Sequence, residues 1–186
     1  MKTKLLCILL MCIALIGCNN INKTKNLEEK ELTNEQVFID EFVNDFIVEI
    51  DVEVEKSDIF HIFYLTNNFE NYFIGKQAIG VSVIGRKEFQ KIKFNLPKDT
   101  IPTRLRIDFG SNKEQNIIKL KSIKISYEDR TLTLTDSLFT KYFEHNKFID
   151  LLGDETMKLI LDKEGKYDPY IIGKVWLNRK LEKLAN

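Results

Sequence analysis

The sequence has little cysteine and histidine, and both shortages narrow the possible functions. All three cysteines lie within the first eighteen of 186 residues, so the rest of the chain has no thiol pair for a disulfide. The only histidines are His61 and His145, and the chain lacks H-E-x-x-H, G-x-S-x-G and a glycine-rich phosphate loop. Zinc hydrolysis, serine esterase chemistry and nucleotide handling therefore lack their minimal parts. We expect neither an enzyme nor a cofactor, although 28 acidic residues always allow a carboxylate pair suited to glycoside hydrolysis.

The chain also lacks a charge surplus and an apolar run of transmembrane length. Its 28 basic residues equal its 28 acidic ones, which argues against a nucleic-acid partner, because such binders carry extra positive charge to neutralise phosphates. The apolar run 5–16 has 12 residues, whereas a membrane-spanning helix needs about 20. Because Lys2 and Lys4 precede it, the run has the form of a secretion signal.

The end of this run, Leu15-Ile16-Gly17-Cys18, resembles the lipobox of bacterial lipoproteins. The resemblance implies that residues 1–17 are a signal peptide and that Cys18 becomes the acylated first residue of the mature protein. It also implies anchoring to a membrane of the cell envelope, which we expect to be the outer membrane. Asn19 to Lys23 lack the acidic cluster that exports some Bacteroidetes lipoproteins to the cell surface, so a periplasm-facing position is favoured. The alternative is a secreted protein in which this cysteine is incidental.

The remaining chain predicts a tether, one mainly β domain and a tail. The lipidated cysteine and the polar residues after it, 18–36, predict a flexible tether. Residues 37–177 predict an antiparallel β-sandwich of jelly-roll type, because apolar and polar residues alternate in short segments. Those segments are 46–55, 59–65, 79–84, 88–96, 104–109, 117–120, 122–127, 131–134, 157–161 and 170–177. Within 136–152 the spacing predicts a short helix that Asp136 would cap, and 178–186 form a charged tail for which a helix is one alternative.

Four segments share a pattern with a known group of domains: Asp58-Ile-Phe, Phe89 to Pro97, Leu105 to Gly110, and 117–125. Over about residues 42–135 they resemble galactose-binding-type jelly rolls, as found in Bacteroidetes lipoproteins and in some surface-polysaccharide proteins. The resemblance implies a non-catalytic module that contacts carbohydrate, and it supplies no site pattern.

Four residues are candidates for binding a ligand. Arg104, Arg106 and Asp108 alternate with apolar residues, so they share the outward face of one strand, where arginine donors and an acidic acceptor suit polyhydroxylated or anionic ligands. The alternative is charge pairing with neighbouring strands. Trp176, the only tryptophan, is either a stacking platform for a sugar or, as its neighbours Val175 and Leu177 favour, a buried core residue.

Two other features have a structural interpretation. His61 lies in an apolar segment, which favours a core histidine over a catalytic base. The row Glu49, Asp51, Glu53 and Glu55 points four carboxylates in one direction without enclosing an ion, which favours a solvated strand face over a calcium site.

Two functions follow as hypotheses. The first is an envelope lipoprotein that binds carbohydrate or surface polysaccharide, and an exposed aromatic beside the arginine row would favour it. The second is an envelope lipoprotein that holds a protein partner through a strand edge or an apolar patch.

Overall fold

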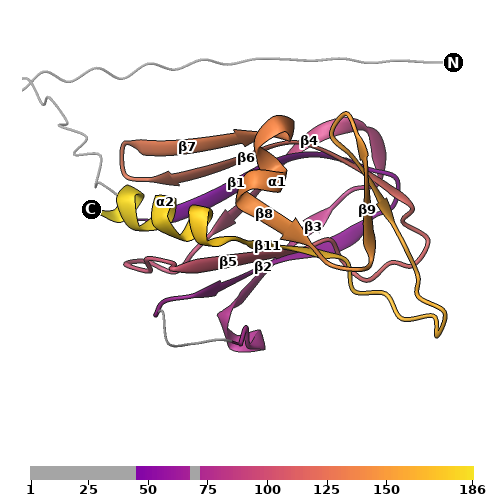
Figure 1. Cartoon of the computed structure of the whole chain (residues 1–186), viewed down its shortest axis with the longest axis horizontal. Coiled ribbons are helices and arrows are strands. Elements are labelled where there is room, and N and C mark those ends of the chain that lie inside the picture. Colours follow the sequence, from indigo (N-terminus) through magenta and orange to yellow (C-terminus); the bar gives the residue numbers. More distant parts are fainter. Residues whose placement is uncertain (1–44, 68–71) are drawn as a thin grey trace, which may run out of the picture. The chain divides into compact units, whose positions relative to one another are not determined.

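The computed structural model describes residues 45–67 and 72–186, so the predicted signal peptide, Cys18, the tether and the start of the predicted domain lie outside the described residues. The described chain forms two antiparallel sheets, which make up a β-sandwich, and two α-helices (Figure 1). The predicted fold class is confirmed. Among the described residues, none belongs to a helix both long and apolar enough to span a bilayer.

The first sheet has the strand order β4-β1-β6-β10-β9, with β7 also paired to β6. Its strands are β1 (Phe46–Val54), β4 (Arg86–Asn95), β6 (Ile117–Tyr127), β7 (Arg130–Thr135), β9 (Ile149–Gly153) and β10 (Thr156–Leu159). The second sheet has the order β3-β2-β5-β11-β8. Its strands are β2 (Asp58–Leu65), β3 (Ala78–Val83), β5 (Arg104–Asp108), β8 (Phe143–His145) and β11 (Tyr170–Gly173). The chain crosses repeatedly from one sheet to the other, so each sheet contains strands from distant parts of the sequence.

The core lies between the sheets and follows the alternation seen in the sequence. In β1 every second residue from Phe46 to Val54 is fully buried, and Phe60 of β2 packs edge-on against Phe109 with ring centroids 5.5 Å apart. Burying one such side chain contributes roughly 1.5–3 kcal/mol. The apolar face of each strand therefore determines which side of it faces the core.

One strand replaces the two predicted at 117–120 and 122–127. The pairing of β1 with β6 shifts register between Asp51 and Val52, which leaves Lys121 as an extra residue on β6. The shift changes the phase of the alternation, so Leu120 and Ile123 both face the core although they lie three residues apart. A β-bulge thus explains why one strand looked like two.

The helix predicted within 136–152 is shorter than expected. Helix α1 (Asp136–Tyr142) has Thr135 and not Asp136 at its N-cap, and it ends where Phe143 takes an extended conformation. The following residues form β8, paired with β11, and β9, paired with β10. Residues 143–153 do not become helical despite the helical spacing of their apolar residues, because their pairing as β8 and β9 completes the edges of the two sheets.

The strand predicted at 170–177 is also too long, since β11 ends at Gly173 and helix α2 (Val175–Ala185) follows. Helix α2 includes most of the predicted tail, and it buries Leu177, Leu181 and Leu184 against the sandwich. These leucines have the i, i+4, i+7 spacing of a helix face, a signal that the charged composition of the tail concealed.

Candidate functional site

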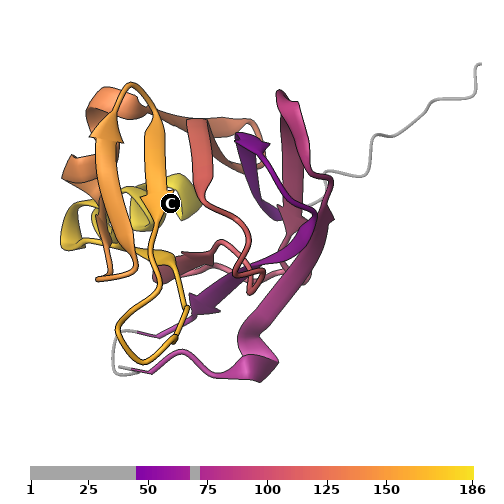
Figure 2. The same ribbon diagram turned by 90° about the vertical axis from the view of Figure 1, so that its right-hand side faces the viewer.

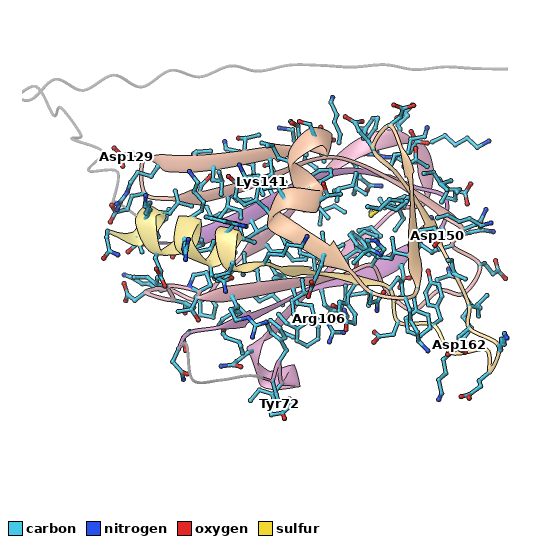
Figure 3. All side chains as sticks on the ribbon, viewed as in Figure 1. Tyr72, Arg106, Asp129, Lys141, Asp150 and Asp162 are labelled. Atoms are coloured by element: carbon cyan, nitrogen blue, oxygen red, sulfur yellow. The ribbon has the colours of Figure 1, made fainter. Side chains whose placement is uncertain are left out.

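Arg106 and Asp108, two of the predicted ligand residues, bind each other. They project from the outer face of β5, where Nε of Arg106 donates to Oδ1 of Asp108 at 2.7 Å and Nη2 donates to Oδ2 at 2.6 Å. The Arg106 side chain is 21% exposed and that of Asp108 is 14% exposed. Figure 3 labels Arg106 on the second sheet. This two-point contact uses the donors and acceptors that a ligand would need.

Neighbouring strands enclose the same guanidinium. It lies 3.8 Å from the ring centroid of Tyr170 on β11 and 5.2 Å from that of Phe63 on β2, and Nη2 approaches Oδ1 of Asp168 at 3.4 Å. Arg106 therefore links β2, β5 and β11. These contacts favour the structural interpretation of Arg106 and Asp108, with the partner acid on the same strand.

The electrostatics of this pair reflect its partial burial. Burial raises the pKa of the Asp108 carboxyl above its ordinary value, although the hydrogen bond and charge of Arg106 oppose the shift. For Arg106, burial alone would lower the pKa, but the hydrogen bond and charge of Asp108 outweigh it, so the pKa is raised. Each charge is thus held in a half-buried place by the other, and removing one leaves the other poorly solvated.

We therefore expect Arg106→Ala to destabilise the protein by about 1–3 kcal/mol, because Asp108 keeps its burial and loses its charged partner. Urea unfolding measures the change, with Arg86→Ala on an exposed part of β4 as the matched control. Ligand affinity should stay unchanged. A variant of native stability would show that Arg106 does not brace the strands.

The other two predicted residues, Arg104 and Trp176, line one open hollow of about 560 Å³. Trp176 is on the first turn of α2 and is 52% exposed, so the expectation of burial was wrong. Burial had been inferred from an apolar strand, and on a helix Trp176 turns away from Leu177, which faces the core. Glu144 and Lys174 also line the hollow.

Guanidinium groups pack on the rings of Trp176 and Phe73. The guanidinium of Arg179 lies 4.9 Å from the ring centroid of Trp176, and that of Arg104 lies 5.8 Å from the ring centroid of Phe73. Beside Phe73, Tyr72 is 83% exposed and is labelled in Figure 3. Of these aromatic residues only Trp176 lines the hollow, together with Arg104 of the predicted row.

His61 does not lie in the core as expected. It is half-buried on the outer face of the second sheet, where its register partners are Asp108 and Gly80. A Cβ on Gly80 would lie 3.0 Å from Nε2 of His61, so the glycine makes room for the ring. The prediction of a core histidine failed because the outward-facing Phe63 is also apolar, so the sequence of β2 suggested that both of its faces are buried.

The acidic row of β1 forms ion pairs with lysines on both neighbouring strands. Glu49 pairs with Lys91 at 3.1 Å, Asp51 with Lys121 at 3.7 Å, and Glu53 with Lys119 at 3.0 Å. Within residues 45–67 and 72–186, no group of three or more histidines, cysteines or acidic residues could hold a metal ion. Glu49, Asp51 and Glu53 therefore lie on a salt-bridged sheet face. Glu55 follows β1 and accepts the backbone N–H of Ile117 at 3.3 Å.

Several residues of the hollow were missed from the sequence. Glu144, Lys174 and Asn178 line it with Arg104 and Trp176, yet they come from β8 and from the start of α2. No local pattern marks them, because they meet only after β11 pairs with both β5 and β8.

The chain matches no known protein family, no curated protein and no solved structure.

Proposed function

We propose that the protein is a lipid-anchored lipoprotein of the bacterial cell envelope whose β-sandwich is a non-catalytic module that binds carbohydrate. The observation that supports this best is the hollow shared by Arg104 and Trp176, two residues that are 72 positions apart in the sequence. An open hollow admits part of a polymer as readily as a small sugar.

The chemistry of the hollow suits a polyhydroxylated ligand. The half-exposed indole of Trp176 offers an apolar face on which the C–H face of a sugar ring can stack, while its N–H remains a donor. Arg104 and Lys174 supply charged donors, Glu144 is an acceptor, and Asn178 supplies both kinds of group. A mixed set of donors and acceptors around an aromatic ring matches the alternating hydroxyl groups of a sugar.

The proposal includes the location of the protein in the cell. The signal sequence 1–17 and the lipobox cysteine Cys18 would tether the sandwich to the outer membrane, with a periplasm-facing position favoured. A tether over 18–36 would let the module reach glycans near the membrane in the periplasm, whereas contact with surface polysaccharide requires the surface-facing position.

A glycan array probed with the purified protein tests the binding function. We expect Trp176→Ala and Arg104→Ala each to lower affinity for the bound glycan by roughly tenfold or more, because each removes a central contact. Tyr72→Ala is the matched control, since Tyr72 is an exposed aromatic that does not line the hollow. Native affinity in the Trp176→Ala variant would refute carbohydrate binding at this hollow.

The second candidate function is a scaffold that holds an envelope protein. The observation in its favour is β9, which forms the edge of the first sheet and leaves Leu152 59% exposed. An unpaired edge with exposed leucine can add a strand from a partner. This candidate predicts that no glycan on the array is bound.

A further inference from the structure

A separate cavity of about 310 Å³ opens beside the edge strands of the two sheets. Helix α1, strand β8 and the β9–β10 hairpin contribute its walls; the hairpin is drawn in orange in Figure 2. A volume of this size lies at the lower end of the range of small-molecule sites. None of the four predicted ligand residues lines it.

The inner part of the cavity is apolar. Leu120, Phe143, Met157 and Ile171 line it, and each is at most 5% exposed. These side chains come from both sheets, so the cavity reaches the hydrophobic core of the sandwich. A ligand must therefore have a hydrocarbon body to gain from entering.

The charge of the cavity has one sign. Glu144 and Glu155 line it, whereas no lysine or arginine of the described chain does, although the protein has 28 such residues. The remaining polar residues of the lining are Ser137, Thr140, His145 and Thr156. The carboxylates favour a positively charged group at the mouth and repel an anion.

The backbone of the β9–β10 turn is unusual at Glu155. Asp154 and Glu155 form the two-residue connection of the β9–β10 hairpin, with φ angles of 47° and 63°. Positive φ at both central positions is the type I′ geometry, in which glycine is strongly preferred at the second position. A glutamate here costs free energy that glycine would not. Glu155 is one of the residues that line the cavity, and its backbone carbonyl accepts the N–H of Leu120 at 2.7 Å.

We propose that this cavity binds a small apolar amine. The hydrocarbon part occupies the space lined by Leu120, Phe143 and Met157, and the ammonium group forms a charge-assisted hydrogen bond with Glu155. The site is distinct from the carbohydrate hollow, although Glu144 borders both.

Titration of the purified protein with phenethylamine tests the proposal, with 3-phenylpropionate as the anionic analogue. We expect saturable binding of the amine and at least about tenfold weaker binding of the acid. Amide chemical shifts should change at Leu120, Met157 and Ile171, which line the cavity. Equal affinity for amine and acid, or no binding of the amine, would overturn the proposal.

Two glycine substitutions in the hairpin separate ligand binding from fold stability. Glu155→Gly should raise the Tm, because it relieves the backbone, and should weaken phenethylamine binding by roughly tenfold. Asp154→Gly should also relieve positive φ but leave the affinity unchanged, because Asp154 does not line the cavity. Unchanged affinity in Glu155→Gly would refute the assigned contact.

A third variant closes the cavity without touching the core. Thr140 is exposed on α1 and lines the cavity, so Thr140→Phe should fill its mouth and abolish amine binding. Thr133→Phe, at an exposed position of β7, should not. Both variants should bind glycan with native affinity. Failure of the amine proposal is therefore distinguishable from failure of the proposed carbohydrate-binding function. Native amine affinity in Thr140→Phe would place the amine elsewhere.

Discussion

A Cys18→Ala variant is expected to incorporate no labelled fatty acid and to leave the membrane fraction completely. The thiol is the only group at the lipobox that can accept the lipid, and alanine removes it. Each CH₂ of an acyl chain buried in the bilayer contributes roughly 0.8 kcal/mol, so two or three chains hold the protein firmly and none leaves it free. Metabolic labelling followed by membrane fractionation measures both effects.

Cys12→Ala is the matched control, because Cys12 lies in the same predicted signal peptide but inside its apolar run. This variant should be acylated and anchored like the native protein. Fatty-acid incorporation that persists in Cys18→Ala would refute the lipoprotein proposal, and the carbohydrate-binding proposal would then need another location.

Gly110→Ala is expected to destabilise the sandwich by about 2–5 kcal/mol. Gly110 follows β5 with φ of +82°, a conformation that costs an alanine about 1–2 kcal/mol. A Cβ there would also overlap the carboxylate of Asp58, which accepts the backbone N–H of Asn112 at 2.7 Å. Displacing that carboxylate breaks a partly buried hydrogen bond, and its loss costs about 1–3 kcal/mol. At roughly 2–4 °C per kcal/mol for a chain of this size, the Tm should fall by on the order of 10 °C.

Two comparisons isolate the cause of this loss. Gly153 has a similar φ of +86°, and no described atom lies within 4 Å of a Cβ built on it, so Gly153→Ala should show the backbone cost alone. In an Asp58→Ala background, Gly110→Ala should cost no more than Gly153→Ala, because the overlap is gone. Equal losses for Gly110→Ala and Gly153→Ala in the native background would show that Asp58 is not displaced.

The predicted strands were recovered where burial and local pattern agree. The alternation from Phe46 to Val54 becomes β1, with its apolar side facing the core and its acidic side paired with lysines. Such a pattern is decisive because only one phase of a strand can bury every second side chain. The predicted signal peptide and the resemblance to a lipobox likewise depend on contiguous residues, and both lie outside the described residues.

The candidate site could be predicted only in part. Arg104 and Trp176 could be selected from the sequence because their chemistry suits a sugar, but their meeting in one hollow depends on β11 pairing with β5 and on α2 starting at Val175. Arg106 and Asp108 looked equally suitable, yet the rings of Phe63 and Tyr170 enclose the guanidinium and favour its contact with Asp108. Strand pairing therefore decides which outward-facing side chains contact residues of neighbouring strands and which line the hollow.

By itself, the sequence determined the alternating strands and the mainly β class, because both follow from periodicities within about ten residues. Only the tertiary structure decided that α1 stops at Tyr142, that His61 faces outward, and that an acidic, apolar cavity opens beside β8 and β9. The physical reason is that edge pairing, register and enclosure join residues far apart in the chain. The free energy of these interactions arises only when the sheets assemble, so it cannot be inferred from any single segment of the sequence.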